Sequence, residues 1–114
     1  MSPGASEILF QGYLPIAQGP LYAMPTSLGN GRVEISTLWV CNTGAVIVPT
    51  TLLFGAGTLT KANALFWNAP VEPGRTYIIF GGDPVSMKSG YKFEGNATVA
   101  SAVVVTIFGV VYSG

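Results

Sequence analysis

Histidine is missing from this 114-residue chain, and cysteine and charged residues are scarce. The sequence holds one cysteine, five Asp or Glu residues and five Lys or Arg residues. General acid–base catalysis, nucleophilic catalysis and metal binding depend on these residue types, so few candidates for such chemistry exist. A single cysteine also excludes an intramolecular disulfide. We therefore expect no catalytic residue, no metal site and no cofactor, and we predict that the chain is not an enzyme.

The shortage of charge has a second consequence, for the surface. Charged residues make up 9% of the chain, against about 25% in an average protein, and hydrophobic residues make up 49%. No charged residue lies between Glu34 and Lys61, or after Glu94. Large exposed apolar patches normally mark an interface, so the composition predicts one component of an assembly. Zero net charge and scattered basic residues argue against a nucleic-acid partner, and the apolar run over 97–112 is too short for a membrane helix.

Short β-strands are predicted along most of the chain after residue 31. Side chains alternate over 33–42, and further strand-like runs cover 46–54, 76–80, 85–87, 91–94 and 99–112. Turns are predicted at 29–31, 73–74, 81–84 and 89–90. Helical propensity is confined to 61–68, which is either one helical turn or a loop leading to a short strand. The pattern predicts an all-β fold, a single β-sandwich of about seven or eight short strands, jelly-roll or Ig-like.

Residues 1–31 differ from the rest of the chain. They contain four prolines and five glycines with apolar residues between them. We interpret this segment as an extended N-terminal arm that lies along a neighbouring molecule. The chain is thereby divided into an arm over 1–31 and a β-sandwich domain over 32–114.

The last predicted strand is apolar on both faces. Val103, Val105 and Ile107 lie on one side, and Val104 and Phe108 on the other. A strand of this kind is covered on both sides. In a two-layer sandwich of this size, the second cover would come from another subunit.

The remaining aromatic residues and the thiol have simple interpretations. We place Trp39 on the inward face of its strand and treat Cys41 as a small core hydrophobe. Trp67, beside Phe66, is interpreted as an interface anchor in preference to a sugar-stacking platform. The candidate interface residues are Phe10, Tyr13, Leu14, Tyr22, Trp67, Phe108 and Tyr112.

The order of several short segments along the chain carries a resemblance to known proteins. These segments are residues 9–15 (LFQGYLP), 21–25 (LYAMP), 40–43 (VCNT), 73–77 (PGRTY) and 88–93 (KSGYKF), before a valine-rich strand that ends in a Gly-Val unit. In this order the chain resembles a loose group of small all-β virion proteins of tailed bacteriophages. The likeness extends over most of the chain and departs at 44–60, where prolines and glycines interrupt the expected strand. It implies a structural role in the virion, although the group does not share one location on the particle.

From the composition and the resemblance we expect a capsid decoration (cement) protein on the outside of a phage head. It would bind the major capsid protein and its own copies, as a homotrimer, and stabilise the head without a small-molecule ligand. One alternative is another virion position, in the tail, baseplate or head fibre. The other is a carbohydrate-binding adhesin that uses Trp67 and Tyr91 on loops.

Overall fold

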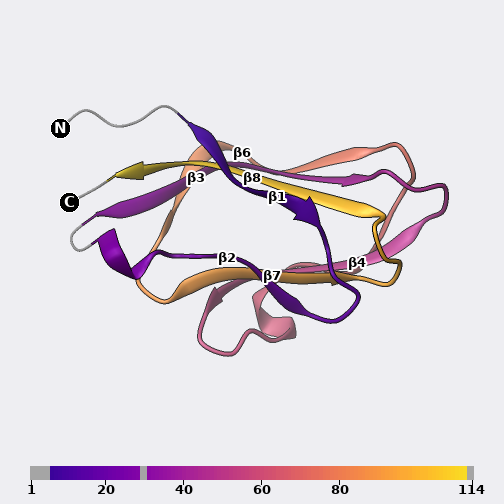
Figure 1. The fold of residues 1–114 in the computed structure, drawn as a ribbon, viewed down its shortest axis with the longest axis horizontal. Coiled ribbons are helices and arrows are strands. Elements are labelled where there is room, and N and C mark those ends of the chain that lie inside the picture. The colour runs from indigo at the N-terminus through magenta and orange to yellow at the C-terminus, as the bar shows by residue number, and fades with distance from the viewer. Residues whose placement is uncertain (1–5, 29–30, 113–114) are drawn as a thin grey trace.

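The fold is an antiparallel β-sandwich in a computed structural model that describes residues 6–28 and 31–112, apart from the side chains of residues 27 and 80–83. These residues form eight strands and two short 3-10 turns (Figure 1). The strands are β1 (Glu7–Tyr13), β2 (Gly19–Ala23), β3 (Arg32–Asn42), β4 (Val48–Ala56), β5 (Ala64–Val71), β6 (Thr76–Met87), β7 (Tyr91–Ala97) and β8 (Val103–Tyr112), and the turns are η1 (Thr26–Leu28) and η2 (Lys61–Asn63).

The strand order identifies the kind of sandwich. One sheet has the order β1-β8-β3-β6 and the other has the order β2-β7-β4-β5. Strand β1 pairs with β8, β2 with β7, β3 with β6, and β4 with β5, all antiparallel. The chain is thus one long antiparallel ribbon rolled into two layers, and the β8–β3 and β7–β4 pairs close the roll. This is a jelly roll, so the predicted β-sandwich is confirmed and the jelly-roll alternative holds.

The division into an arm and a sandwich is wrong for the described part of residues 1–31. Strand β1 pairs with β8 in one sheet, and β2 pairs with β7 in the other. Leu14, between them, is 2% exposed. The prolines and glycines suggested an arm, but those that the structure describes lie at or next to strand ends and in the connections around two short edge strands. Edge strands tolerate proline because one of their sides donates no ladder hydrogen bond.

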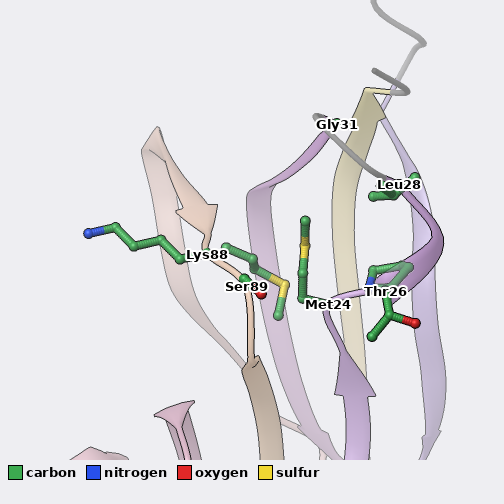
Figure 2. Close-up of a pocket in the computed structure, with 8 residues that line it drawn as sticks. Met24, Thr26, Leu28, Gly31, Lys88 and Ser89 are labelled. Atoms are coloured by element: carbon green, nitrogen blue, oxygen red, sulfur yellow. The ribbon is translucent and has the colours of Figure 1, made fainter.

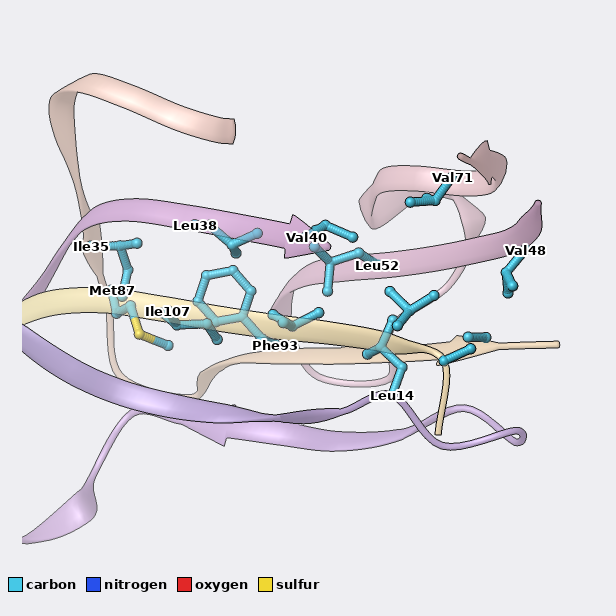
Figure 3. Packing of buried hydrophobic residues seen from close by; sticks show 14 of the residues in the cluster. Leu14, Ile35, Leu38, Val40, Val48, Leu52, Val71, Met87, Phe93 and Ile107 are labelled. Carbon is cyan, nitrogen blue, oxygen red and sulfur yellow. The ribbon is translucent and has the colours of Figure 1, made fainter. Parts of the chain in front are cut away.

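The core lies between the two sheets and is built by alternation. Inward side chains of β3, β4, β7 and β8 are buried, and Phe93 fills the middle (Figure 3). The largest of them have under 2% of their surface exposed, and they include Ile35, Leu38, Leu52 and Ile107. Strands β1 and β2 also contribute to this core, because Leu9, Phe10, Leu21 and Tyr22 pack against the same cluster.

Asn42 is a fully buried polar residue that ties together one end of the sandwich. Its amide Nδ2 donates to the carbonyl oxygens of Val46 (2.7 Å) and Val71 (2.8 Å), and its Oδ1 accepts from the Gly44 amide (2.8 Å). The side chain therefore links the β3–β4 turn to the end of β5. A buried amide is tolerated only when its hydrogen bonds are made, and these contacts satisfy that condition.

Two local predictions need correction. The expected turn at 81–84 is a bulge inside one long strand, β6, because Val85 pairs with Ile35 and Gly81 with Thr37. The expected strand over 99–112 begins only at Val103, since positions 98–102 form the turn from β7. By contrast, the helical turn in 61–68 and the strand that follows it are both present, as η2 and β5.

Trp39 is not a core residue, because the phase of β3 changes before it. Val33 and Ile35 point inward, but the pairing of β3 shifts between Ile35 and Thr37, so the next inward residues are Leu38 and Val40. One extra residue in a strand moves every later side chain to the opposite face. Trp39 therefore points outward, with 41% of its surface exposed.

A second bulge lies across the sheet from the first. Ile8 pairs with Phe108 and Phe10 with Ile107, which leaves Leu9 as an extra residue in β1. Both neighbours of β8 thus bulge next to Phe108: β1 opposite the Ile107–Phe108 step and β3 opposite the Phe108–Gly109 step. A Cβ added at Gly109 would lie 2.7 Å from Leu9 Cδ1 and closer still to the Glu34 carbonyl oxygen. The three strands approach so closely here that only glycine fits.

We expect Gly109→Ala to lower the free energy of unfolding by about 1 to 3 kcal/mol, as overpacked substitutions do. The matched control is Gly19→Ala in β2, where the added Cβ meets its nearest atom at an ordinary 3.4 Å. Urea denaturation of both variants measures the difference. Equal stabilities would show that β1, β8 and β3 are further apart than described.

Candidate interaction surface

The outer surface of the β1-β8-β3-β6 sheet is the most unusual surface of the described structure. We call it the apolar face. The pairing of the strands aligns its side chains in rows: Tyr13, Val104 and Cys41 form one row, and Trp39 lies beside Ile78 in the next. Its apolar members are Ile8, Tyr13, Trp39, Cys41, Ile78, Val104, Phe108, Val110 and Tyr112.

Aromatic rings form the middle of the apolar face. The rings of Trp39 and Phe108 meet edge to face, with centroids 4.8 Å apart. Around them, Ile8 and Tyr13 are each 52% exposed, and Ile78 is 63% exposed. The hydrogen bond from Gln11 Nε2 to Thr106 Oγ1 (3.0 Å) joins two polar side chains in the row of Trp39. Large side chains exposed together on one sheet are typical of a surface that a partner covers.

Among the side chains that the structure describes, the charged ones on this face lie at only one of its borders. Arg32 lies over the Tyr112 ring, 3.9 Å from its centroid, and forms an ion pair with Glu34 (3.6 Å). Both residues are at the start of β3, where β8 ends. Apolar rows therefore run from this border to the opposite end of the sheet.

The outer surface of the other sheet has the opposite character. Glu94 forms an ion pair with Lys92 (3.2 Å) and accepts a hydrogen bond from Gln18 Nε2 (2.7 Å). Leu53 points outward from β4 but is fully buried, and Leu59, in the loop before η2, is 4% exposed. The chain thus covers Leu53 and Leu59 on this sheet, although Trp67 is exposed, and it leaves the apolar residues of the apolar face open.

Four of the seven candidate interface residues lie on the outer surface of one of the two sheets. Tyr13, Phe108 and Tyr112 lie on the apolar face, and Trp67 is exposed on β5 of the other sheet, with Lys61 Nζ 5.6 Å from its ring centroid. The prediction for Leu14 is wrong. Leu14 is a core residue, because alternation from Tyr13 turns its side chain inward between the sheets. Sequence reasoning assigned Ile8, Trp39 and Ile78 to no interface, since only the bulges and the register place them on this face.

Phe10 and Tyr22 are half-buried and pack against the core, so they do not form part of an open surface. Burial, and to a lesser extent the Glu7 carboxylate, raises the pKa of Tyr22 above its usual value. Tyr91 also faces inward: its ring meets Phe54 edge to face at 5.5 Å and lies against the core. Trp67 and Tyr91 consequently belong to opposite sides of their sheet and do not form one sugar-stacking platform.

Cys41 needs a similar correction. It lies between the fully buried Val40 and Asn42, so its own side chain points outward, half-buried on the apolar face. The prediction of a core hydrophobe assumed that the alternation of β3 continues unbroken from Val33, which the bulge prevents.

One end of the sandwich also exposes aliphatic side chains. Ile16 in the β1–β2 connection, Val46 and Ile47 in the β3–β4 turn and Val99 in the β7–β8 turn are 40–60% exposed. Hydrogen bonds hold these turns together, as between the Thr43 amide and the Ala102 carbonyl (2.7 Å). This end, the loop end, is a second and smaller apolar surface.

A shallow pocket of about 250 Å³ lies at the other end, beside the β6–β7 turn. Met24, Leu28 and Met87 contribute apolar lining, and Lys88 points away from it (Figure 2). The described lining residues include no carboxylate and no thiol. General acid–base chemistry therefore has no candidate pair in this part of the pocket.

Residue groups that could bind a metal ion are also lacking: no three His, Cys, Asp or Glu side chains gather within the described ranges. No helix in residues 6–28 or 31–112 is both long and apolar enough to cross a membrane. Comparisons with protein-family models, with curated proteins and with solved structures find no match for this chain.

The polar cluster on the opposite sheet predicts a pH dependence of stability. The hydrogen bond from Gln18, and then Lys92, lowers the pKa of Glu94 below its ordinary 4.5. The folded state therefore binds this proton less readily than the unfolded state, so the stabilisation is present above pH 4.5 and is lost as the pH falls through the folded pKa. We expect Glu94→Gln to lose less stability than the wild type when the pH is lowered below this value.

Urea denaturation at a series of acidic pH values measures this effect. Gln18→Ala is the matched variant, because it removes the donor and keeps the carboxylate, so its pH dependence should also become weaker. Identical pH dependence in all three proteins would contradict the role of the Gln18–Glu94 contact.

Proposed function

We propose that the chain is a structural protein of a phage virion, a capsid decoration protein that binds the major capsid protein and stabilises the head. The apolar face carries this proposal. It presents exposed Ile8, Tyr13, Trp39 and Ile78 on one sheet, while the other sheet covers its outward leucines and displays charge. A protein that binds a large, regular surface through one side needs this asymmetry.

The mechanism is thermodynamic. Each square ångström of apolar surface removed from water contributes about 25 cal/mol, and part of this offsets the entropy lost on association. Many identical copies on one shell make modest contacts sufficient, because neighbouring attachments reinforce one another. Bridging adjacent capsid subunits would then resist the outward pressure of packaged DNA without any catalytic step.

The fold supports this function without deciding it. Jelly rolls occur in viral capsid proteins, lectins and cupins, and a fold shared so widely does not specify a function. The adhesin alternative used Trp67 and Tyr91 on loops, but both residues lie in strands and Tyr91 packs inward against Phe54. The same apolar face would also serve a position in the tail, baseplate or head fibre, and the following experiments separate these positions.

Particles that lack the protein should release DNA at a lower temperature than complete particles, and added wild-type protein should restore the release temperature. We expect Ile78→Glu to abolish this restoration, because it places a charge beside Trp39 on the apolar face. A fluorescent DNA dye and a temperature ramp provide the measurement.

Ile47→Glu is the matched control, since Ile47 is exposed to a similar extent (56% against 63%) but lies at the loop end. It should restore the release temperature as the wild type does. If Ile47→Glu fails to restore the release temperature and Ile78→Glu restores it, the capsid contact lies at the loop end. Equal release temperatures with and without the protein would count against decoration and favour the tail or host recognition.

The single thiol gives an independent measurement of the same contact. Cys41 is half-buried in the apolar face, in the row of Tyr13 and Val104, and a bound partner would cover it. We expect N-ethylmaleimide to modify Cys41 in the free protein and to modify it at least several-fold more slowly on the particle. Mass spectrometry of the released protein measures the modified fraction. An unchanged rate on particles that bind the protein would place the contact on another surface.

A further inference from the structure

Strand β1 has an edge at which no other strand of the described structure pairs. It is the outermost strand of its sheet and is bonded to β8 alone (Figure 1). Open edges invite another strand, and natural proteins commonly block them with proline or lysine. The other three edge strands each contain a proline: Pro20 in β2, Pro70 in β5 and Pro84 in β6. Strand β1 contains neither proline nor lysine.

The direction of the unpaired groups in β1 follows from the ladder. The Leu14 amide donates to the Val103 carbonyl (2.8 Å), so the main-chain amide and carbonyl groups of Leu14 point toward β8. Residues of an antiparallel strand alternate between facing their partner and facing away from it. The amide and carbonyl groups of Gln11 and Tyr13 therefore point to the open edge.

The accessible stretch is short and symmetric. Toward the N-terminus it ends at the bulge at Leu9, and toward the C-terminus it ends at Pro15, which has no amide hydrogen. Gly12 lies midway between these two positions. A second copy of β1, running antiparallel, would meet the same limits in reverse order. The stretch is therefore matched to itself about a two-fold axis at Gly12.

We propose that two copies of this chain pair through their β1 edges, with Gln11 of each hydrogen-bonded to Tyr13 of the other. This register makes four main-chain hydrogen bonds, two in each Gln11–Tyr13 pair. It places the Gln11 amide stem beside the second copy's Tyr13 ring on the outer surface, where cross-strand pairs stabilise each other. Glu7, the only charged residue of β1, lies outside the paired stretch, so no like charges oppose one another.

A second copy fits better than an unrelated strand because each copy has this one unblocked edge. Pairing of β1 with β2, β5 or β6 of another copy would meet a proline. Pairing of β1 with β1 also joins the two apolar faces, since Ile8 and Tyr13 lie on both the edge strand and that face. The result is one eight-stranded sheet with a continuous apolar outer surface. This inference does not depend on the virion role, and it gives a two-fold dimer in place of the homotrimer expected from the sequence.

Sedimentation equilibrium of the purified full chain at micromolar concentrations tests the pairing. The wild type should have twice the monomer mass of 11.9 kDa, and Gln11→Pro should be a folded monomer because it removes a donor that faces the open edge. Gln11→Ala, which keeps the main-chain donor, should remain a dimer. Ala23→Pro should also remain a dimer. It places a proline at the open edge of β2, since the neighbouring Met24 amide bonds to Tyr91 of β7.

Ile78→Glu separates this inference from the proposed function. It alters the apolar face and leaves the edge intact, so it should dimerise normally even where it fails to bind particles. A monomeric wild type, or a Gln11→Pro variant that dimerises as the wild type does, would overturn edge pairing and leave the capsid proposal standing.

If Gln11→Pro does not fold, hydrogen exchange of the wild type tests whether two β1 edges pair. The Gln11 and Tyr13 amides should exchange more slowly as the protein concentration rises, by about tenfold when about nine chains in ten are paired, because only the open form exchanges. The Ala23 amide, at the open edge of β2, should show no such dependence. Exchange of Gln11 and Tyr13 that is independent of concentration would overturn the proposal.

Discussion

The close approach of three strands at Gly109 determines what this protein presents to its surroundings. Strands β1 and β3 each carry one extra residue next to Phe108 of β8, and the missing side chain of the adjacent Gly109 leaves room for both strands. The paired bulges change the phase of both neighbours at the same level. Beyond them Leu38 and Val40 point inward, and Trp39 and Cys41 point outward. Without this change, Trp39 would enter the core and the apolar face would lose its centre.

The scarcity of charge has a specific location once the sheets are known. On the β2-β7-β4-β5 sheet, Lys92, Glu94 and Gln18 supply the polar surface of an ordinary folded protein, and the chain covers Leu53 with its own loop. The apolar face has no such cover among the described residues. The charge-free sequence from Glu34 to Lys61 and after Glu94 includes most of β3 and all of β8, the two middle strands of this face. The first of these stretches also contains all of β4 in the other sheet, where the outward Leu53 is covered, so the low charge content leaves an open apolar surface mainly on the β1-β8-β3-β6 sheet.

Sequence reasoning recovered the β character, the sandwich and most strands after residue 31, because period-two alternation and Gly or Pro turns are local signals. It failed for β1 and β2, since short edge strands with a bulge lose the alternation that identifies a strand, and prolines obscured them further. Leu14 was misplaced because it was assigned to the arm, whereas Trp39 and Cys41 were misplaced by the bulge in β3. Counting odd and even positions gives the right face only while the register is unbroken, and the register is a property of the neighbouring strands.

An open edge and an open apolar face on the same sheet would usually lead to uncontrolled association. A two-fold axis at Gly12 avoids this, because isologous pairing uses each open edge once and closes, whereas head-to-tail pairing continues into fibres. The proline-bearing edges of β2, β5 and β6 then limit further growth by strand addition. The apolar face is left for a partner of another kind, and the polar sheet is left for solvent. The division between edge and face thus allows a neutral chain to assemble on a surface without joining its copies indefinitely.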